Sequence, residues 1–440
     1  MSEVIFRGGT VLTIDPQHPV LTGDVAIRDG AIVQVGGNYT PQTSDYTILD
    51  STDCVVMPGL VQAHVHTCQT LARGRADDLE LLDWLRKVIW PYEASLDEAA
   101  ASAAGELACA ELLLGGTTAI LDMATVHHTD AIFGAAHRSG IRATIGKAMM
   151  DAADPQIPKG LRETTADSLD ESARLIKAWH GRAAGRLRYA YAPRFVLSCT
   201  DELLREVGVQ AKARGVRIHT HASENTGEIA LVRERFGKDN IIVLDELGLL
   251  GPHACIAHGI HLSEAERTLL ATRGAHVCSC PSSNLKLASG ICPLPELIAA
   301  GVSMALGADG APCNNNLDGF MELRLAALLH KPRLGPRTLP APEVVRLATL
   351  GGAAALGLAD QIGSLEVGKR GDVIAVDVST LHTIPATNPW SQIAYSTQSS
   401  DVRHVAVDGA LVVRDRTLLT LDVAQVKERA RKTAERLFVG

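Results

Sequence analysis

The feature that most restricts the fold of this sequence is a long stretch, residues 59 to 365, in which apolar segments alternate with amphipathic ones. The segment 117–125, for example, has the apolar character of a buried strand, and the segment 130–140 that follows has helical spacing. Repeated strand–helix alternation predicts an α/β fold in which helices cover a parallel sheet. A closed (β/α)₈ TIM barrel fits this length best, although the periodicity leaves an open, doubly wound sheet as an alternative.

Both ends of the chain have a different character. Residues 1–58 and 366–420 contain short alternating strands, with the turns Asp29-Gly30 and Asp408-Gly409 between apolar runs. We therefore expect the two ends to build one small β-sandwich domain, with the barrel of residues 59–365 inserted between them. The last stretch, 421–440, is predicted to be a charged amphipathic helix.

Composition excludes several classes of protein. The net charge is −8 and there is no polybasic stretch, so a nucleic-acid partner is not expected. The N-terminus does not resemble a secretory signal, and no run of apolar residues is long enough to span a membrane. The nine scattered cysteines form no Cys-x-x-Cys pair, which predicts free thiols and a cytoplasmic protein. No glycine-rich nucleotide-binding motif opens a helix.

The strongest local motif is the pair His64 and His66 at the end of an apolar strand. Residues at i and i+2 on a strand point the same way, so both imidazoles can face one point. Later apolar runs end in further metal-binding side chains, namely His219 or His221, His258 and Asp309. In barrel enzymes the catalytic groups lie at such C-terminal strand ends, and imidazole with carboxylate suits a divalent metal. Spacing alone does not choose between His219 and His221.

These motifs resemble the amidohydrolase superfamily, and within it the branch that contains aminopurine deaminases and s-triazine hydrolases. The resemblance extends over essentially the whole chain, including the strand-rich ends, the His64-Val65-His66 motif and the segments 282–290 and 306–316. It implies four metal ligands: His64, His66, His221 and Asp309. His221 is preferred to His219 because Glu224 follows it in the His-x-x-Glu pattern of this branch.

The resemblance also implies one divalent metal, with Zn²⁺ as the default and Fe²⁺ or Mn²⁺ as alternatives. Bimetallic relatives carry a bridging lysine on the fourth barrel strand, and the expected fourth strand here, residues 188–194, contains no lysine. The metal would lower the pKa of a bound water, whose proton Asp309 accepts. Glu224 would protonate the ring and the leaving amine, and His258 would stabilise the tetrahedral centre.

Substrate contacts are inferred from the same resemblance. Glu93 matches a carboxylate that accepts hydrogen bonds from ribose hydroxyls, and Trp84 lies in a segment that resembles the substrate lid of the family. Gln69 and Arg194 are expected to contact the ring, and His128 follows a strand as a further substrate contact. Arg194 stands where nucleoside deaminases most often have histidine, whereas guanine deaminases resemble this chain at Gln69 and Arg194-Phe195.

The preferred hypothesis is therefore a hydrolytic deaminase of an aminopurine nucleoside of the 5'-deoxyadenosine, methylthioadenosine or S-adenosylhomocysteine type. Alternatives are a guanine- or pterin-type deaminase, an s-triazine hydrolase, and a non-catalytic scaffold that has lost its metal. The expected partner is the small-molecule substrate, and we expect a homo-oligomer.

Overall fold

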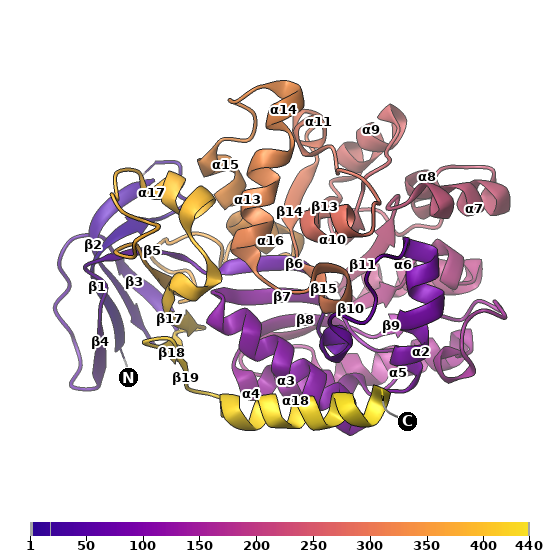
Figure 1. The fold of residues 1–440 in the computed structure, drawn as a ribbon, viewed down its shortest axis with the longest axis horizontal. Coiled ribbons are helices and arrows are strands. Elements are labelled where there is room, and N and C mark those ends of the chain that lie inside the picture. Colours follow the sequence, from indigo (N-terminus) through magenta and orange to yellow (C-terminus); the bar gives the residue numbers. More distant parts are fainter. Residues whose placement is uncertain (1–2, 18, 439–440) are drawn as a thin grey trace.

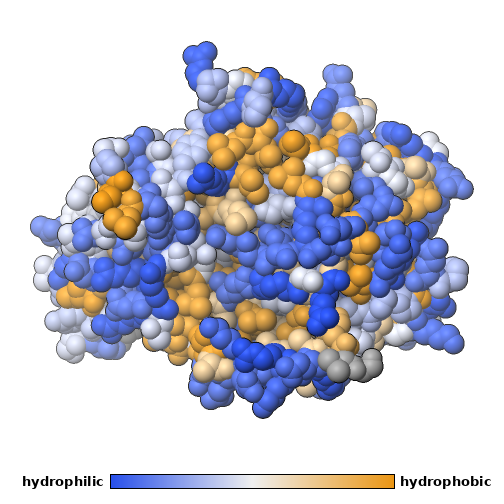
Figure 2. All heavy atoms as spheres, in the orientation of Figure 1, coloured by the Kyte–Doolittle hydropathy of each residue, from blue (hydrophilic) through white to orange (hydrophobic). Residues whose placement is uncertain are grey.

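The computed structural model describes residues 3–17 and 19–438. In Figure 1 a barrel with its helices occupies the middle of the molecule, and strands from both chain ends lie together at one side. On the face shown in Figure 2 most of the surface is hydrophilic, and apolar side chains gather over α13 (Gly319–Leu329) and α14 (Lys331–Leu334). Met321, Leu328 and Leu334 are exposed in this area.

The predicted TIM barrel is confirmed. Its strands pair in parallel in the order of the chain, and each binds the next one along. Their bounds are β6 (Leu60–His66), β7 (Thr117–Met123), β8 (Arg142–Gly146), β10 (Leu187–Pro193), β11 (Arg217–Ala222), β12 (Ala254–His258), β13 (His276–Ser279) and β14 (Ser303–Leu306). Directly after β14, the short β15 (Asp309–Gly310) pairs with β6. This pairing closes the ring, so the open sheet is rejected.

Helices surround the barrel. The main ones are α3 (Glu98–Leu114), α4 (Thr129–Ser139), α5 (Thr165–Trp179), α6 (Asp201–Arg214), α7 (Thr226–Phe236), α8 (Asn240–Glu246), α9 (Glu264–Arg273), α11 (Leu294–Ala299), α13, α15 (Ala341–Arg346) and α16 (Gly352–Ala355). Local sequence explains their limits: α9 begins with a capping box of Ser263 and Glu266 and ends at Gly274, whose φ is 67°.

The strand β6 is bulged just before its histidines. Val61 and Ala63 lie in the apolar interior of the barrel, where the Cys255 thiol reaches across to the main-chain carbonyl of Ala63. The register of β6 against β7 shifts between Gln62 and Val65. A β-bulge turns the side chains that follow it, and this one lets His64 and His66 face the mouth of the barrel although Ala63 faces its interior.

The two chain ends form one continuous nine-stranded mixed sheet. Its strands are β1 (Glu3–Leu12), β2 (Val20–Arg28), β3 (Ala31–Val35), β4 (Tyr46–Asp50), β5 (Cys54–Pro58), β16 (Val373–Asp377), β17 (Val402–Val407), β18 (Ala410–Arg414) and β19 (Thr417–Leu418). Strand β1 pairs with β4 through its first half and with β5 through its second. The strands of both chain ends therefore build one mixed sheet, as expected.

The two predicted hairpin turns have the left-handed backbone that such turns require. Asp29 and Gly30 have φ values of 50° and 83°, and Asp408 and Gly409 have values of 54° and 79°. The turns lie against each other, since a Cβ added to Gly409 would lie 2.5 Å from the Cα of Gly30. Glycine is therefore required at Gly409 both by conformation and by space.

The C-terminal segment forms the predicted helix, α18 (Val423–Phe438), which runs along the outside of the barrel (Figure 1). Arg436 of this helix pairs with Asp97, the N-cap of α3, at 2.6 Å. The Phe438 ring stacks on Tyr92 with 5.8 Å between centroids. All nine cysteines are free and buried, and none of the described helices is long and apolar enough to cross a membrane.

A buried ion pair joins the barrel to the nine-stranded sheet of the chain ends. The Arg142 guanidinium, at the start of β8, donates two hydrogen bonds of 2.8 Å to Asp372 and one of 2.9 Å to Asp408. Arg142 and Asp372 are both buried. Breaking a buried pair leaves one charge without compensation and is costly.

We expect Arg142→Met to lower the free energy of unfolding by about 3–5 kcal/mol, because the Asp372 carboxylate would lose its buried partner. The matched control is Arg233→Met, which breaks the exposed pair with Asp239 and should cost less than about 1 kcal/mol. Urea denaturation followed by fluorescence measures both values. Equal losses in the two variants would show that the buried pair does not hold the domains together.

Candidate metal centre and catalytic pocket

Four predicted metal ligands meet at the C-terminal mouth of the barrel. The Nε2 atoms of His64 and His66 lie 3.2 and 3.5 Å from Oδ1 of Asp309. Nε2 of His221, on β11, lies 3.2 Å from Nε2 of His66. The pairing of β15 with β6 is what places Asp309 beside the two histidines, since Asp309 is opposite Val65 in the register.

The second nitrogen of two of these rings is already occupied. Nδ1 of His66 donates to the main-chain carbonyl of Met123 at 2.8 Å, and Nδ1 of His221 donates to that of Arg194 at 2.7 Å. In a neutral imidazole the other nitrogen, Nε2, then carries a lone pair. Two lone pairs 3.2 Å apart repel unless a cation lies between them. Nε2 of His64 is also buried without a hydrogen-bond partner, so the donor set fits a divalent metal ion.

The structure separates His221 from His219. Nε2 of His219 lies 2.8 Å from Nδ1 of His64, on the side of that ring that faces away from Asp309. A strand rises roughly 3.3 Å per residue, so a residue two positions earlier lies deeper in the barrel. His219 therefore orients His64 from behind, a positioning role that sequence reasoning did not assign to it.

Burial and neighbouring charges set the protonation of the centre. Burial and the adjacent His64 lower the pKa of His66 to about 3, so this ring is neutral at pH 7. Burial acts to raise the pKa of Asp309, but His64 and His258 outweigh it and hold the pKa well below its usual range. The Ser283 hydroxyl also donates to Oδ2 of this carboxylate at 2.6 Å. Neutral imidazoles around an ionised carboxylate are the ligand states that a metal requires.

Glu224 and His258 lie beside this centre. Oε2 of Glu224 is 3.3 Å from Nε2 of His258, and the Asn284 side chain holds Nδ1 of the same ring at 2.8 Å. Burial raises the pKa of Glu224 to about 7, although His258 acts to lower it. Burial acts to lower the pKa of His258, but the Glu224 and Asp309 carboxylates raise it above its ordinary value. A carboxyl group with a pKa near 7 can both give and take a proton at neutral pH.

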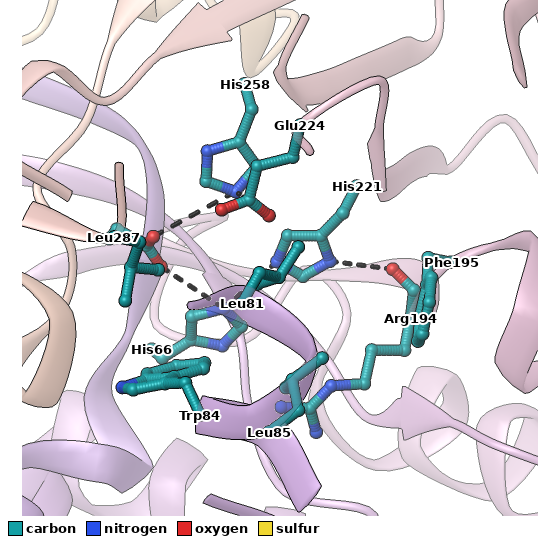
Figure 3. A pocket seen from close by; sticks show the side chains of 11 residues that line it. His66, Leu81, Trp84, Leu85, Arg194, Phe195, His221, Glu224, His258 and Leu287 are labelled. Carbon is teal, nitrogen blue, oxygen red and sulfur yellow. Dashed lines mark hydrogen bonds and ion pairs between the residues drawn. The ribbon is translucent and has the colours of Figure 1, made fainter. Parts of the chain in front are cut away.

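These groups line a small pocket at the mouth of the barrel. Its polar floor is formed by metal-centre and acid–base residues, and its walls are mostly apolar; the lining comprises His66, His221, Glu224, His258, Asp309, Arg194, Leu81, Trp84, Leu85, Phe195 and Leu287. Figure 3 shows Leu81 and Trp84 next to the His66 ring and Leu85 next to the Arg194 side chain. Leu81 and Trp84 belong to α1 (Leu81–Trp84), and Leu85 belongs to the π-helical turn η2 (Leu85–Ile89). A water-sized sphere can enter only about 30 Å³, so this segment closes the pocket as a lid.

Three of the predicted substrate residues form one buried cluster. The Arg194 guanidinium pairs with Glu93 through hydrogen bonds of 2.5 and 3.1 Å, and Gln69 donates to the same carboxylate at 2.8 Å. Arg194 lines the pocket, whereas Gln69 and Glu93 are not among its lining residues. Glu93 belongs to the short helix α2 (Trp90–Ala94), which follows the lid in the chain. Glu93 is only 5% exposed.

His128 does not join the site. It is exposed at the start of α4, with a φ of 62°, and it is not among the residues that line the pocket. The structure therefore does not bring His128 to the pocket, and its contact with substrate stays a prediction. Sequence reasoning, in contrast, assigned no role to Ser283 and Asn284, which hold Asp309 and His258. Both residues lie on α10 (Pro281–Lys286), which follows the C-terminal end of β13, and this position at a strand end is the sequence signal that could have identified them.

Comparison with known proteins places this geometry in a family. The profile of the amidohydrolase family matches residues 55–412. A 5'-deoxyadenosine deaminase of Methanosarcina mazei is 38% identical over 439 residues, 99% of each chain. A 5-methylthioadenosine/S-adenosylhomocysteine deaminase of Syntrophobacter fumaroxidans is 41% identical over 440 residues, 98% of each chain.

Solved structures give the same result. An adenosine deaminase of Xanthomonas campestris with bound zinc superposes with a TM-score of 0.92 at 34% identity and 99% coverage of both chains. A guanine deaminase of C. acetobutylicum with bound guanine has a TM-score of 0.85 at 26% identity, covering 93% of this chain and 99% of its own. With its barrel, its His/Asp centre and these relatives, the chain belongs to the amidohydrolase family.

Proposed function

We propose that this protein is a metal-dependent hydrolytic deaminase that releases ammonia from an aminopurine nucleoside of the 5'-deoxyadenosine, methylthioadenosine or S-adenosylhomocysteine type. The observation that carries the proposal is the convergence of His64, His66, His221 and Asp309 beside the buried carboxyl of Glu224. Similarity to deaminases of these nucleosides over nearly the whole chain supports it.

The metal in this proposal is a single Zn²⁺ ion held by those four side chains. Three imidazoles and one carboxylate are typical zinc ligands, and the similar adenosine deaminase carries zinc. A divalent ion in this position supplies a Lewis acid that makes water nucleophilic at neutral pH. The fourth barrel strand, β10, contains no lysine, which supports one metal rather than two.

The neighbouring residues then handle protons and charge. Oδ2 of Asp309 faces His258 and is free of the two β6 histidines, so it can accept the proton of the attacking water. Glu224 is within reach of the same space and delivers a proton to the ring nitrogen and later to the leaving amine. His258, whose Nδ1 is held by Asn284, directs Nε2 toward the pocket and stabilises the oxygen of the tetrahedral centre.

The pocket walls suit a flat heteroaromatic ring. Trp84, Phe195 and Leu287 provide apolar surface above the polar floor. Glu93 already accepts from Arg194 and Gln69, and a ribose hydroxyl would share this carboxylate once the lid moves. The second candidate is deamination of a guanine- or pterin-like base, favoured by the Arg194 guanidinium in the pocket wall. Homo-oligomerisation and a cytoplasmic location stay predictions.

Replacing His66 with alanine should abolish metal binding and activity together. Three remaining ligands bind a divalent ion weakly, and Asp309 would lose one of its two neighbouring imidazoles. Metal content after gel filtration and ammonia release measure the two effects. The control is His137→Ala, an exposed histidine on α4 that should keep stoichiometric metal. A His66 variant that retains both metal and turnover would contradict the assignment of the ligands.

Glu224→Gln should retain the metal but lower kcat by about 10²–10⁴-fold, because the amide cannot shuttle a proton. The exposed Glu234→Gln on α7 is the matched control and should have the kcat of the wild type. Metal analysis and steady-state kinetics on the same preparations separate lost chemistry from lost metal. Undiminished turnover of the Glu224 variant would refute its acid–base role.

A small substrate panel separates the two candidate functions. We expect a kcat/KM for 5'-deoxyadenosine about 100-fold or more above that for guanine, because a site built to hydrogen-bond a substrate group rejects analogues that lack it. Here that group is the ribose diol, which Glu93 would bind. Ammonia release from 5'-deoxyadenosine, methylthioadenosine, guanine and a pterin measures the preference. A higher kcat/KM for guanine would select the second candidate instead.

A further inference from the structure

A second pocket lies at the opposite, N-terminal mouth of the barrel, far along the strands from the metal centre. It offers about 300 Å³ to a water-sized sphere. Arg188 near the start of β10 and Arg217 at the start of β11 line it, because both are at the beginning of their strands. His180, Lys212 and His253 from the adjoining segments complete a ring of nitrogen-bearing side chains. Burial lowers the pKa of both histidines, so the positive charge of the ring comes from Arg188, Arg217 and Lys212.

This ring has no acidic counterpart. None of the described residues that line the pocket is an aspartate or glutamate. Arg217 donates only to main-chain carbonyls, those of Pro252 at 2.6 Å and Ala355, and its buried Nε has no hydrogen-bond partner. Arg188 likewise donates to the carbonyl of Gly185 at 3.2 Å. Nε2 of His253 is also buried without a partner.

The two buried arginines discussed above, Arg142 and Arg194, differ from these half-buried ones. Arg142 and Arg194 each pair with a carboxylate through two hydrogen bonds. At Arg217, burial lowers the pKa of the guanidinium to about 10, and no carboxylate opposes this. Among the described residues, the carboxylate that acts on Arg188 is that of Asp360, which is exposed. Arg188 and Arg217 are half-buried, Lys212 is exposed, and no acid lines the pocket beside them, so the pocket favours an anion.

A purely structural role explains part of the arrangement. By bridging Pro252 and Ala355, Arg217 ties the loop before β12 to the end of α16. That role uses two of its N–H groups but leaves its Nε unused, and it does not account for Arg188, Lys212 or His253. The overall charge of the chain is −8, so a general excess of basic residues does not explain why three cations gather here.

We propose that this pocket binds an oxyanion, either inorganic phosphate or the phosphoryl group of a nucleotide. Guanidinium groups present N–H donors in a fork that matches the oxygens of phosphate, and lysine adds a point charge. The pocket lies at the other end of strands β10 and β11 from Arg194 and His221. The site is therefore separate from the catalytic centre, and its existence does not depend on which heterocycle the enzyme deaminates.

Calorimetric titration of the metal-loaded enzyme with sodium phosphate, at constant ionic strength set by sodium chloride, tests the proposal. We expect saturable binding by the wild type and no competitive inhibition of ammonia release at the same concentrations. Arg188→Met and Lys212→Met should each weaken binding by about 10-fold or more, the scale of a hydrogen bond to a charged group. Lys177→Met, an exposed lysine on α5 outside the pocket, should bind like the wild type.

AMP and adenosine form the second arm of the experiment, and they are titrated into enzymes that also carry Glu224→Gln so that deamination does not contribute heat. If the occupant is a phosphoryl group of a nucleotide, AMP binds more tightly than phosphate and Arg188→Met weakens AMP but not adenosine. If it is free phosphate, AMP binds no better than phosphate. Absence of saturable binding of either anion, or equal binding by the wild type, Arg188→Met and Lys212→Met, would overturn the proposal. Lys212 is exposed, so its variant keeps the test valid even if Arg188→Met folds poorly.

Discussion

The closure of the barrel between β15 and β6 is the constraint on which the rest of the site depends. It brings Asp309 from the last strand beside His64 and His66 of the first. The carbonyl of Met123, at the end of β7, then fixes the ring of His66, and that of Arg194, after β10, fixes the ring of His221. The metal centre is thus oriented by the main chain of its own barrel, and a rigid scaffold of this kind is what preorganised catalysis requires.

Charged side chains are distributed unequally between the two mouths of the barrel. At the catalytic mouth the carboxylates of Asp309, Glu224 and Glu93 face imidazoles, a guanidinium and the metal position. At the opposite mouth, Arg188 and Arg217 face main-chain carbonyls and no acid. Strands β10 and β11 therefore lead to side chains that suit a cation at their C-terminal ends and carry side chains that suit an anion at their N-terminal ends.

Sequence reasoning predicted the barrel, the composite domain, the C-terminal helix and the side chains that meet at the metal centre. Strand periodicity and the two-residue spacing of His64 and His66 are local properties and can be predicted from the sequence. The choice of His221 and Asp309 as further ligands came from the family resemblance and stays a prediction. Sequence reasoning missed the support around these side chains: His219 behind His64, and Ser283 and Asn284 beside Asp309 and His258. It also placed His128 at the substrate, whereas that residue is exposed at the start of α4.

What the sequence by itself determined is the order of strands and helices and the kinds of ligand at each strand end, since both follow from neighbouring residues. The family resemblance favoured His221 over His219, but only the tertiary structure shows His221 beside His66 and His219 behind His64, because depth along a tilted strand depends on the register of its neighbours. The pairing of Glu93 with Arg194, which lie 101 positions apart in the chain, is likewise visible only in the tertiary structure. No periodicity encodes such a contact, since it arises only when the closed barrel brings the two segments together.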